Sequence, residues 1–427
     1  MRVTRRQYPV GQGCFHASQI CRTNDKGDEV TFRYVYDCGS MNQSILRGVV
    51  DSFRMQTSSL DALFVTHLDD DHVNGIDRLL GTVQVDTVYL PYVDDVVPIV
   101  ELVEADLNGA LSASLIEAWI EPQSWFGRRG VSEIVRVRAS TEDGQSRPAP
   151  GDDFDDKSDL PNPSSEETPP TSEQDRGGEF RSRVRVRYMN SGAQLRFSES
   201  GEPHSWTLVP HVDPAPANQR KRFMKELTRV LCLPRGTPIA ASRLAAALRN
   251  DSDRKRIRNC YEKILAGGSR RRHNRVSMSL YSGPSEGSRD LLWEYSIVGC
   301  LSACAPRVVK AGGVPYFPCE EQAVGWIGTG DAELRTAKVR EAWRRTYSPF
   351  EEQVSTLLLP HHGSTGSFHP ELLEFQNLAL CVASAGAPSR YKHPGHSVVN
   401  EILNQGIVFC HVSQRARSGI REQLRSR

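Results

Sequence analysis

The stretch FVTHLDDDHVNG, residues 64–75, constrains this chain most, because it sets three consecutive carboxylates directly after an apolar run. Like charges at this spacing repel one another, so they need either full solvation or a bound cation. His67 and His72 flank Asp69 and Asp71, and imidazole nitrogen and carboxylate oxygen both suit zinc, manganese or iron. The alternative is a polar turn whose aspartate caps the next helix.

The number of donors in this stretch bears on the number of ions. One tetrahedral ion with an open position needs three protein ligands, whereas His67, Asp69, Asp71 and His72 supply four within six residues. The sequence therefore predicts two divalent metal ions, zinc or manganese. Asp70, the middle carboxylate, is left over by the spacing, and we expect it to point away from the metals or to support their ligands.

Composition gives little hint of a partner, since the 53 basic and 52 acidic residues of this 427-residue chain nearly cancel. No segment approaches the roughly 20 apolar residues of a membrane span. The N-terminus MRVTRRQYPVGQG has no apolar stretch resembling a signal peptide. We therefore expect a cytoplasmic protein with no membrane partner and with free thiols at its ten scattered cysteines.

Strand and helix patterns alternate along most of the chain, which favours a layered α/β sheet architecture. Helical spacing predicts helices at 99–120, 338–348 and 397–406. Apolar or alternating segments predict strands at 30–40, 60–67, 85–93, 180–190, 276–282, 291–298, 323–331, 354–364, 378–386 and 406–413.

Two segments interrupt this pattern. Residues 141–180 hold twelve acids, three bases and almost no apolar side chains, so we expect 140–180 to be a disordered acidic loop. Residues 219–275 hold seventeen Lys or Arg against four acids, and 181–272 is predicted to be a strand plus a basic helical insertion. That bias fits either a solvated helix face or a lid that attracts an anionic substrate. The flanking segments, 1–139 and 273–427, would be two halves of one α/β domain.

The spacing H-x-D-x-D-H after an apolar strand resembles the metal motif of the metallo-β-lactamase fold, in the variant that has aspartate, here Asp69, in place of the second histidine. That variant resembles the hydrolase domain of competence-type (ComEC-like) DNA-uptake proteins and their soluble relatives. The resemblance implies a four-layer αββα fold interrupted by the acidic loop and the basic helical segment. Further segments match in the family's order: PVGQGCF (9–15), VYDCGS (35–40), HNRVSMSLY (273–281), GTGD (328–331), LPHHGS (359–364) and KHPGHSVV (392–399).

The resemblance also implies how the ligands divide between the ions. It assigns His67 and Asp69 to one ion and Asp71 and His72 to the other, with the Asp331 carboxylate bridging both. Independently, the glycines of GTGD permit a sharp turn that leaves Asp331 at the end of a strand. Asp71 and Asp331 are accordingly the predicted catalytic residues.

Further histidines would complete the metal site. The resemblance implies that His361 or His362 is a ligand and that His393 contacts either a metal or the anionic group of the substrate. Neighbouring side chains on a strand point to opposite faces, so only one of the pair would face the ions, and His361, which comes first, is slightly favoured. Asp37 would support a ligand imidazole by a hydrogen bond, or would be a simple turn aspartate.

The predicted chemistry is hydrolysis. Two ions about 3.5–4 Å apart can hold a bridging hydroxide and stabilise negative charge on a scissile phosphate. The arginines of RRRHNR, next to the N-x-x-S strand, could grip phosphates. The residues expected to bind substrate are Asn274, Ser277, Arg271 and Arg272.

The sequence thus predicts a metal-dependent hydrolase that cleaves a phosphodiester, with DNA and RNA among the candidate substrates. One alternative is a small-molecule hydrolase acting on a lactone, a phosphonate or a cyclic nucleotide. The other is a metal-binding component of a multi-protein bacterial defence system. In that case the acidic loop or the helical insertion would recruit a protein partner.

Overall fold

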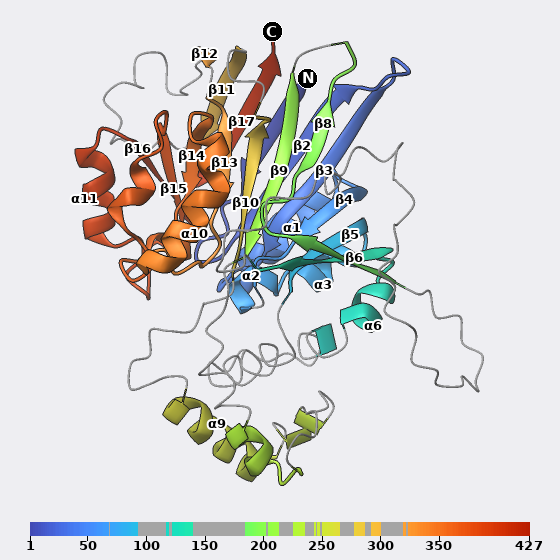
Figure 1. Ribbon diagram of the computed structural model, residues 1–427, viewed down its shortest axis with the longest axis vertical. Helices are drawn as coiled ribbons and strands as arrows, with labels where there is room; N and C mark the ends of the chain where they lie inside the picture. The colour runs from blue at the N-terminus through green and yellow to red at the C-terminus, as the bar shows by residue number, and fades with distance from the viewer. Residues whose placement is uncertain are drawn as a thin grey trace.

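The protein was analysed as a computed structural model, which builds an α/β fold around two β-sheets (Figure 1). The residues that the structure describes are 1–67, 69–92, 117–118, 122–139, 184–201, 204–212, 225–234, 243–244, 246–247, 250–264, 277–286, 292–299, 319–321 and 323–427.

The first sheet joins strands from both ends of the chain. Strands β3 to β7 run parallel, whereas β1 pairs antiparallel with β2 and β17, and β17 with β11. Within the described residues its order is β12 (Cys319–Glu321), β11 (Trp293–Gly299), β17 (Ile420–Ser426), β1 (Arg2–Gln7), β2 (Phe15–Thr23), β3 (Glu29–Cys38), β4 (Ser59–Phe64), β5 (Gln84–Pro91), β6 (Glu133–Arg138) and β7 (Arg185–Asn190).

The second sheet has the same mixed character. Strands β13 to β16 run parallel, and β10, β9 and β8 extend the sheet with antiparallel pairs. Its order within the described residues is β16 (Val408–Val412), β15 (Leu380–Ser384), β14 (Val354–Leu358), β13 (Gly325–Gly328), β10 (Met278–Pro284), β9 (Ser205–Val212) and β8 (Leu195–Ser198).

Figure 1 shows α10 and α11 beside strands β13 to β16 of the second sheet, and α1 and α3 pack against the first sheet through shared apolar residues. In α1 the apolar positions recur on one face, and Asn42 caps its first turn by accepting a hydrogen bond from the Ile45 backbone at 3.1 Å. The helices with bounds given by the described residues include α1 (Gln43–Arg54), α2 (Asp70–Val73), α3 (Ile76–Leu80), α6 (Pro122–Gly127), α9 (Asp251–Ile264), α10 (Ala337–Tyr347) and α11 (His396–Asn404).

Three apolar clusters hold these elements together. Between the sheets, aromatic side chains such as Tyr36, Phe64 and Trp326 are buried in one cluster. The second cluster lies between the first sheet and its helices, and the third lies under α10, where Trp343 is fully buried and donates from its indole nitrogen to Ser279 Oγ at 3.1 Å. Burial of large aromatic surfaces on both faces of a sheet fixes its position between neighbouring layers.

The topology brings distant segments to one edge. The carboxyl ends of parallel strands lie on the same edge of a sheet, which is where loops most often carry function in α/β folds. Segments following β4, β13, β14 and β15 all begin at such ends. These are the segments in which the sequence predicted metal ligands.

Most predicted strands are present with shifted ends. The strand expected at 60–67 ends at Phe64, and the one expected at 354–364 ends at Leu358, where a 3-10 turn at Pro360–Gly363 begins. Among the described residues of 181–272 there are three strands, β7, β8 and β9, rather than one. The helix expected at 99–120 lies outside the described residues apart from 117–118, and the acidic loop at 140–180 lies outside them entirely. Of the helices that are described, none combines the length and the apolar character needed to cross a membrane.

Candidate metal centre

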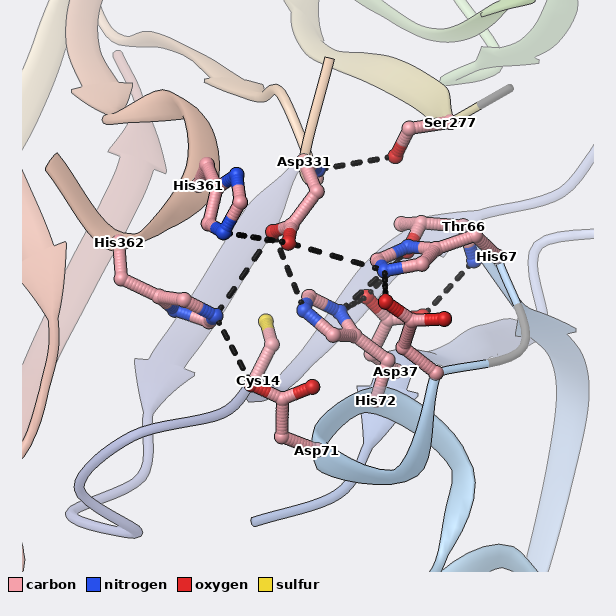
Figure 2. Close-up of polar contacts among 12 residues, drawn as sticks. Cys14, Asp37, Thr66, His67, Asp71, His72, Ser277, Asp331, His361 and His362 are labelled. Carbon is pink, nitrogen blue, oxygen red and sulfur yellow. Dashed lines mark hydrogen bonds and ion pairs between the residues drawn. The ribbon is translucent and has the colours of Figure 1, made fainter. Parts of the chain in front are cut away.

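The centre is built from loops that leave both sheets at the carboxyl ends of their parallel strands. His67 follows β4, and His72 lies in the short helix α2 just beyond it. Asp331 follows β13, and the pair His361–His362 follows β14. Residues far apart in the sequence therefore meet at one point between the sheets, as Figure 2 shows.

Asp37 and Thr66 hold the histidines of the first sheet. The buried Asp37 carboxylate accepts hydrogen bonds from the Thr66 backbone at 2.8 Å, from Thr66 Oγ1 at 2.7 Å and from His72 Nδ1 at 2.7 Å. Thr66 Oγ1 also lies 2.8 Å from His67 Nδ1. Because Nδ1 of both rings is engaged on this side, Nε2 of each faces the centre of the site.

Asp331 is held by its own backbone. The Asp331 N–H donates to Ser277 Oγ at 2.9 Å. Gly330, just before it, has a φ of +52°, and a Cβ there would lie 2.2 Å from Ser277 Oγ. Glycine is therefore required at this turn, both for its conformation and for the close approach of the serine. Ser277, expected to bind substrate, is instead buried beneath Asp331.

The histidine pair does not lie on a strand, so the expected alternation of faces does not apply. His361 and His362 both adopt left-handed backbone conformations, with φ of 48° and 59°. This turn directs both rings toward Asp331: His361 Nε2 lies 3.6 Å from Oδ2 and His362 Nε2 lies 3.7 Å from Oδ1. The His361 side chain is 34% exposed, whereas that of His362 is 4% exposed.

Four imidazoles thus surround one carboxylate. Figure 2 shows His361 and His362 pointing toward Asp331 from one side, with His67 and His72 on the other. His72 Nε2 lies 3.2 Å from Asp331 Oδ1, and His67 Nε2 lies 3.8 Å from Asp331 Oδ2. This convergence is the main feature of the site.

The three consecutive aspartates occupy different places. Asp71 Oδ2 lies 3.1 Å from His362 Nε2, and Asp69 Oδ2 lies 3.7 Å from His67 Nε2. Asp70 is the first residue of α2, and neither Asp69 nor Asp70 belongs to the two donor groups described below. Burial, followed by the neighbouring charge of Asp71, raises the pKa of the Asp70 carboxyl to about 6.

A close backbone contact fixes Asp71 and His72, and sequence reasoning gave it no role. The Cys14 N–H donates to the Asp71 carbonyl at 3.1 Å. A Cβ on Gly13 would lie 2.6 Å from that carbonyl oxygen, and a Cβ on Gly39 would lie 2.4 Å from the His72 nitrogen. The glycines of VGQG and DCG therefore let two loops pack directly on the backbone of the predicted ligands.

The charges at the site influence one another strongly. Burial opposes ionisation of Asp71 and Asp331, but their imidazole neighbours outweigh it and lower the pKa of both carboxyls. Burial also disfavours the charged form of His72, yet the carboxylates of Asp331 and Asp37 raise its pKa well above the usual value. Burial and then the charge of His72 lower the pKa of His67 to about 3. The two adjacent rings therefore favour opposite protonation states.

The residues fit a divalent metal ion by their donor chemistry. Ligand atoms of His67, His72 and Asp331 lie within 4.8 Å of one another, as do those of Asp71, His72 and His362. Within the described part of the chain, the buried Nε2 atom of His67 makes no hydrogen bond, and that of His72 faces Asp331 Oδ1 at 3.2 Å without hydrogen-bond geometry. Buried imidazole nitrogens left in this state are costly, and a metal ion would satisfy them.

The remaining predicted residues are less central. The half-buried His393 lies in the loop after β15, with its ring centroid 5.4 Å from that of His361. Burial and then the charges of His361 and His362 lower its pKa to about 4. The expected substrate contacts Asn274, Arg271 and Arg272 lie outside the described residues.

Comparison with known proteins adds little to this picture. No protein-family model matches the chain, and neither does any curated protein. A solved structure of a long form RNase Z from yeast is similar with 16% sequence identity and a TM-score of 0.15, over 21% of this chain and 14% of that chain. The chain thus matches only a small fraction of the yeast enzyme, and a TM-score this low bears on neither fold nor function.

Proposed function

We propose that this protein is a metal-dependent hydrolase of the metallo-β-lactamase fold that binds two divalent ions and cleaves a phosphodiester. The observation that carries the proposal is the convergence of four imidazole Nε2 atoms within 3.8 Å of the Asp331 carboxylate. Folding alone does not require this arrangement, because four imidazole rings directed at one buried carboxylate exceed what that carboxylate needs as partners. Such clusters of interacting titratable groups are typical of functional sites. The two sheets with helices on their outer faces are consistent with the proposed fold.

The donors present suffice for two ions. One imidazole nitrogen binds one ion, so His72, which belongs to both donor groups, serves only one of them. His67 and Asp69 would hold one ion, and Asp71 and His72 the other. Asp331 would lie between them, with His361 and His362 completing the set. Bound zinc or manganese would supply Lewis acidity toward the scissile phosphate and acidify a water molecule.

The chain's own residues would keep these donors in place. Asp37 fixes the orientation of the His72 ring, and Ser277 fixes the turn that carries Asp331. Hydrogen bonds of this kind to ligands strongly affect metal affinity. The partly exposed His361 and the half-buried His393 mark the side from which substrate would approach.

A phosphodiester is favoured over a neutral ester by the charge at this entrance. Arg390 and Lys392 are exposed, and Lys392 directly precedes His393. Within the described residues neither forms an ion pair, so both can meet an anionic substrate. A phosphodiester anion would be attracted by these cations and by the bound ions together.

The test is a substrate panel with the metal-depleted protein reloaded with zinc or manganese. The panel contains bis-p-nitrophenyl phosphate, single-stranded DNA, duplex DNA, RNA, a cyclic nucleotide and a lactone. We expect metal-dependent turnover of at least one phosphodiester, abolished in Asp331→Asn and retained in the matched variant Asp70→Asn. Hydrolysis of the lactone alone would overturn the phosphodiester assignment, and the absence of any turnover would overturn the hydrolase assignment.

A further inference from the structure

The loop that carries His393 is packed against the loop 360–364, which carries both histidines of the pair. The Gly395 N–H donates to the Gly363 carbonyl at 2.9 Å. A Cβ on Gly363, where φ is +83°, would lie 2.8 Å from the Pro394 side chain. These contacts hold the loop after β15 directly against the loop that carries two of the candidate metal ligands.

A series of rings leads from the centre to the surface along this loop. His361 Nε2 lies 3.6 Å from Asp331, and the centroids of His361 and His393 are 5.4 Å apart. The Tyr391 ring is nearly parallel to that of His393, at an interplanar angle of 17° and a centroid distance of 6.3 Å. Tyr391 is 46% exposed, so part of its ring remains open to solvent.

The backbone of the loop explains why Tyr391 stays outside. The Lys392 N–H donates to the Ser389 carbonyl at 3.2 Å, and the His393 N–H donates to Ser389 Oγ at 3.0 Å. These bonds close a tight turn, with Lys392 in a left-handed conformation at a φ of 58°. The turn presents Tyr391 between two exposed cations, Arg390 and Lys392. An exposed aromatic ring beside cations is a combination that binds nucleotides, because the base stacks on the ring while the cations attract the phosphate.

We propose that Tyr391 is a stacking surface for the base of a nucleotide unit whose phosphate lies at the candidate metal centre. This inference rests on the proposed function and narrows its substrate class to nucleotide phosphodiesters. Tyr391 would act as a specificity-determining residue: it favours substrates that have a base next to the scissile phosphate and has no effect on the phosphate itself.

The test compares two ligands that share a phosphate and differ in the base. The dissociation constants of adenosine 5′-monophosphate and of inorganic phosphate are measured by calorimetry on the full chain loaded with zinc. We expect the nucleotide to bind more tightly than phosphate. In Tyr391→Ala we expect the nucleotide to lose about tenfold in affinity, the effect of about 1.4 kcal/mol, while phosphate affinity stays unchanged.

Two further variants separate stacking from a general structural effect. Tyr391→Phe keeps the aromatic ring and should retain the wild-type affinity for the nucleotide. Tyr188→Ala is the matched control, because Tyr188 is 49% exposed on β7 and its ring packs against Tyr92. We expect this control to leave both dissociation constants unchanged.

The outcomes distinguish this inference from the proposed function. Equal affinities for the two ligands, or an unchanged nucleotide affinity in Tyr391→Ala, would overturn the stacking role and leave the hydrolase intact. An equal loss of affinity for both ligands in Tyr391→Ala would also overturn it. Inorganic phosphate has no base, so losing a base contact cannot weaken its binding. Failure of the wild-type protein to bind phosphate or nucleotide, together with no turnover of any phosphodiester, would overturn both proposals.

Discussion

Two buried carboxylates of this protein have very different surroundings. Glu422, between the sheets, accepts hydrogen bonds from Arg5 Nε at 3.0 Å and Nη2 at 2.9 Å. It also accepts one from Tyr295 and one from Thr356, each at 3.1 Å. Asp331, in contrast, is surrounded by four imidazoles, two of which have a buried Nε2 with no hydrogen bond among the described residues.

The difference indicates what each cluster is for. A buried ion pair that serves the fold joins opposite charges and fills their hydrogen-bonding positions, because each unsatisfied group is costly. In the Asp331 cluster the imidazole nitrogens and the carboxylate oxygens converge on one point, and a cation bound there would be ligated by both. We therefore expect substitutions in the two clusters to have separable effects, one on metal-dependent activity and the other on stability.

The largest expected effect is on activity. Asp331→Asn removes the carboxylate charge that all four imidazoles face, and we expect kcat/KM for bis-p-nitrophenyl phosphate to fall by more than about 100-fold, or about 2.7 kcal/mol. Asp70→Asn, one residue from two predicted ligands, should stay close to wild type. Equal activity losses in the two variants would show that Asp331 has no special place.

The second effect is on stability. Glu422→Gln leaves the buried Arg5 charge without its partner, and we expect the free energy of unfolding to fall by about 3 kcal/mol. Urea unfolding followed by tryptophan fluorescence measures this change. Asp51→Asn, which breaks an exposed pair with Arg78, is the control and should change stability much less. Metal binding should be unaffected by Glu422→Gln, and its loss there would mean that the clusters are not separable.

A third, smaller effect concerns the support of the metal ligands. Asp37→Asn tolerates the left-handed backbone at this position, where φ is 56°, but one amide oxygen cannot accept all the bonds from Thr66 and His72. We expect metal affinity to weaken by about 10–100-fold in a chelator competition assay. An unchanged affinity would reduce Asp37 to a simple turn aspartate.

The smallest effect is a pH dependence near the Glu422 cluster. His16 is buried and stacked on Trp326 at 4.2 Å, and burial, then the Arg5 charge, lowers its pKa to about 3. Below its unfolded pKa of about 6.5 only the unfolded chain takes up this proton, so stability falls as pH decreases from about 6.5 toward 3. Between pH 6 and 5 the wild type should lose about 1 kcal/mol more unfolding free energy than His16→Phe. Parallel losses would contradict this assignment.

The candidate site was more predictable from the sequence than the fold around it. The spacing in 67–72 places four candidate donors within six residues, so no distant pairing has to be known to group them. The joint orientation of His361 and His362 could not be predicted, since it depends on two left-handed residues that only the surrounding loops enforce. The role of Ser277 was equally hard to predict, because a polar side chain at this position fits a substrate contact as well as the hydrogen bond that it accepts from the Asp331 N–H.

The pairing of strands from distant segments could not be predicted from the sequence either. Strand β17 returns to lie between β1 and β11, and alternation within a segment carries no information about such partners. Strand β8 was missed for another reason: it has four residues, too few for an alternating pattern to stand out. Tyr391 was overlooked because a single exposed aromatic residue has no periodicity.

The most direct test of the central claim is the metal content of the purified protein. Wild type, Asp331→Asn and Asp70→Asn are dialysed against excess zinc or manganese, passed through a desalting column and analysed for bound metal per chain. The account predicts two ions in wild type and in Asp70→Asn, and a clear loss in Asp331→Asn. A wild-type protein that retains no divalent ion, or an Asp331→Asn variant that retains the full amount, would contradict it.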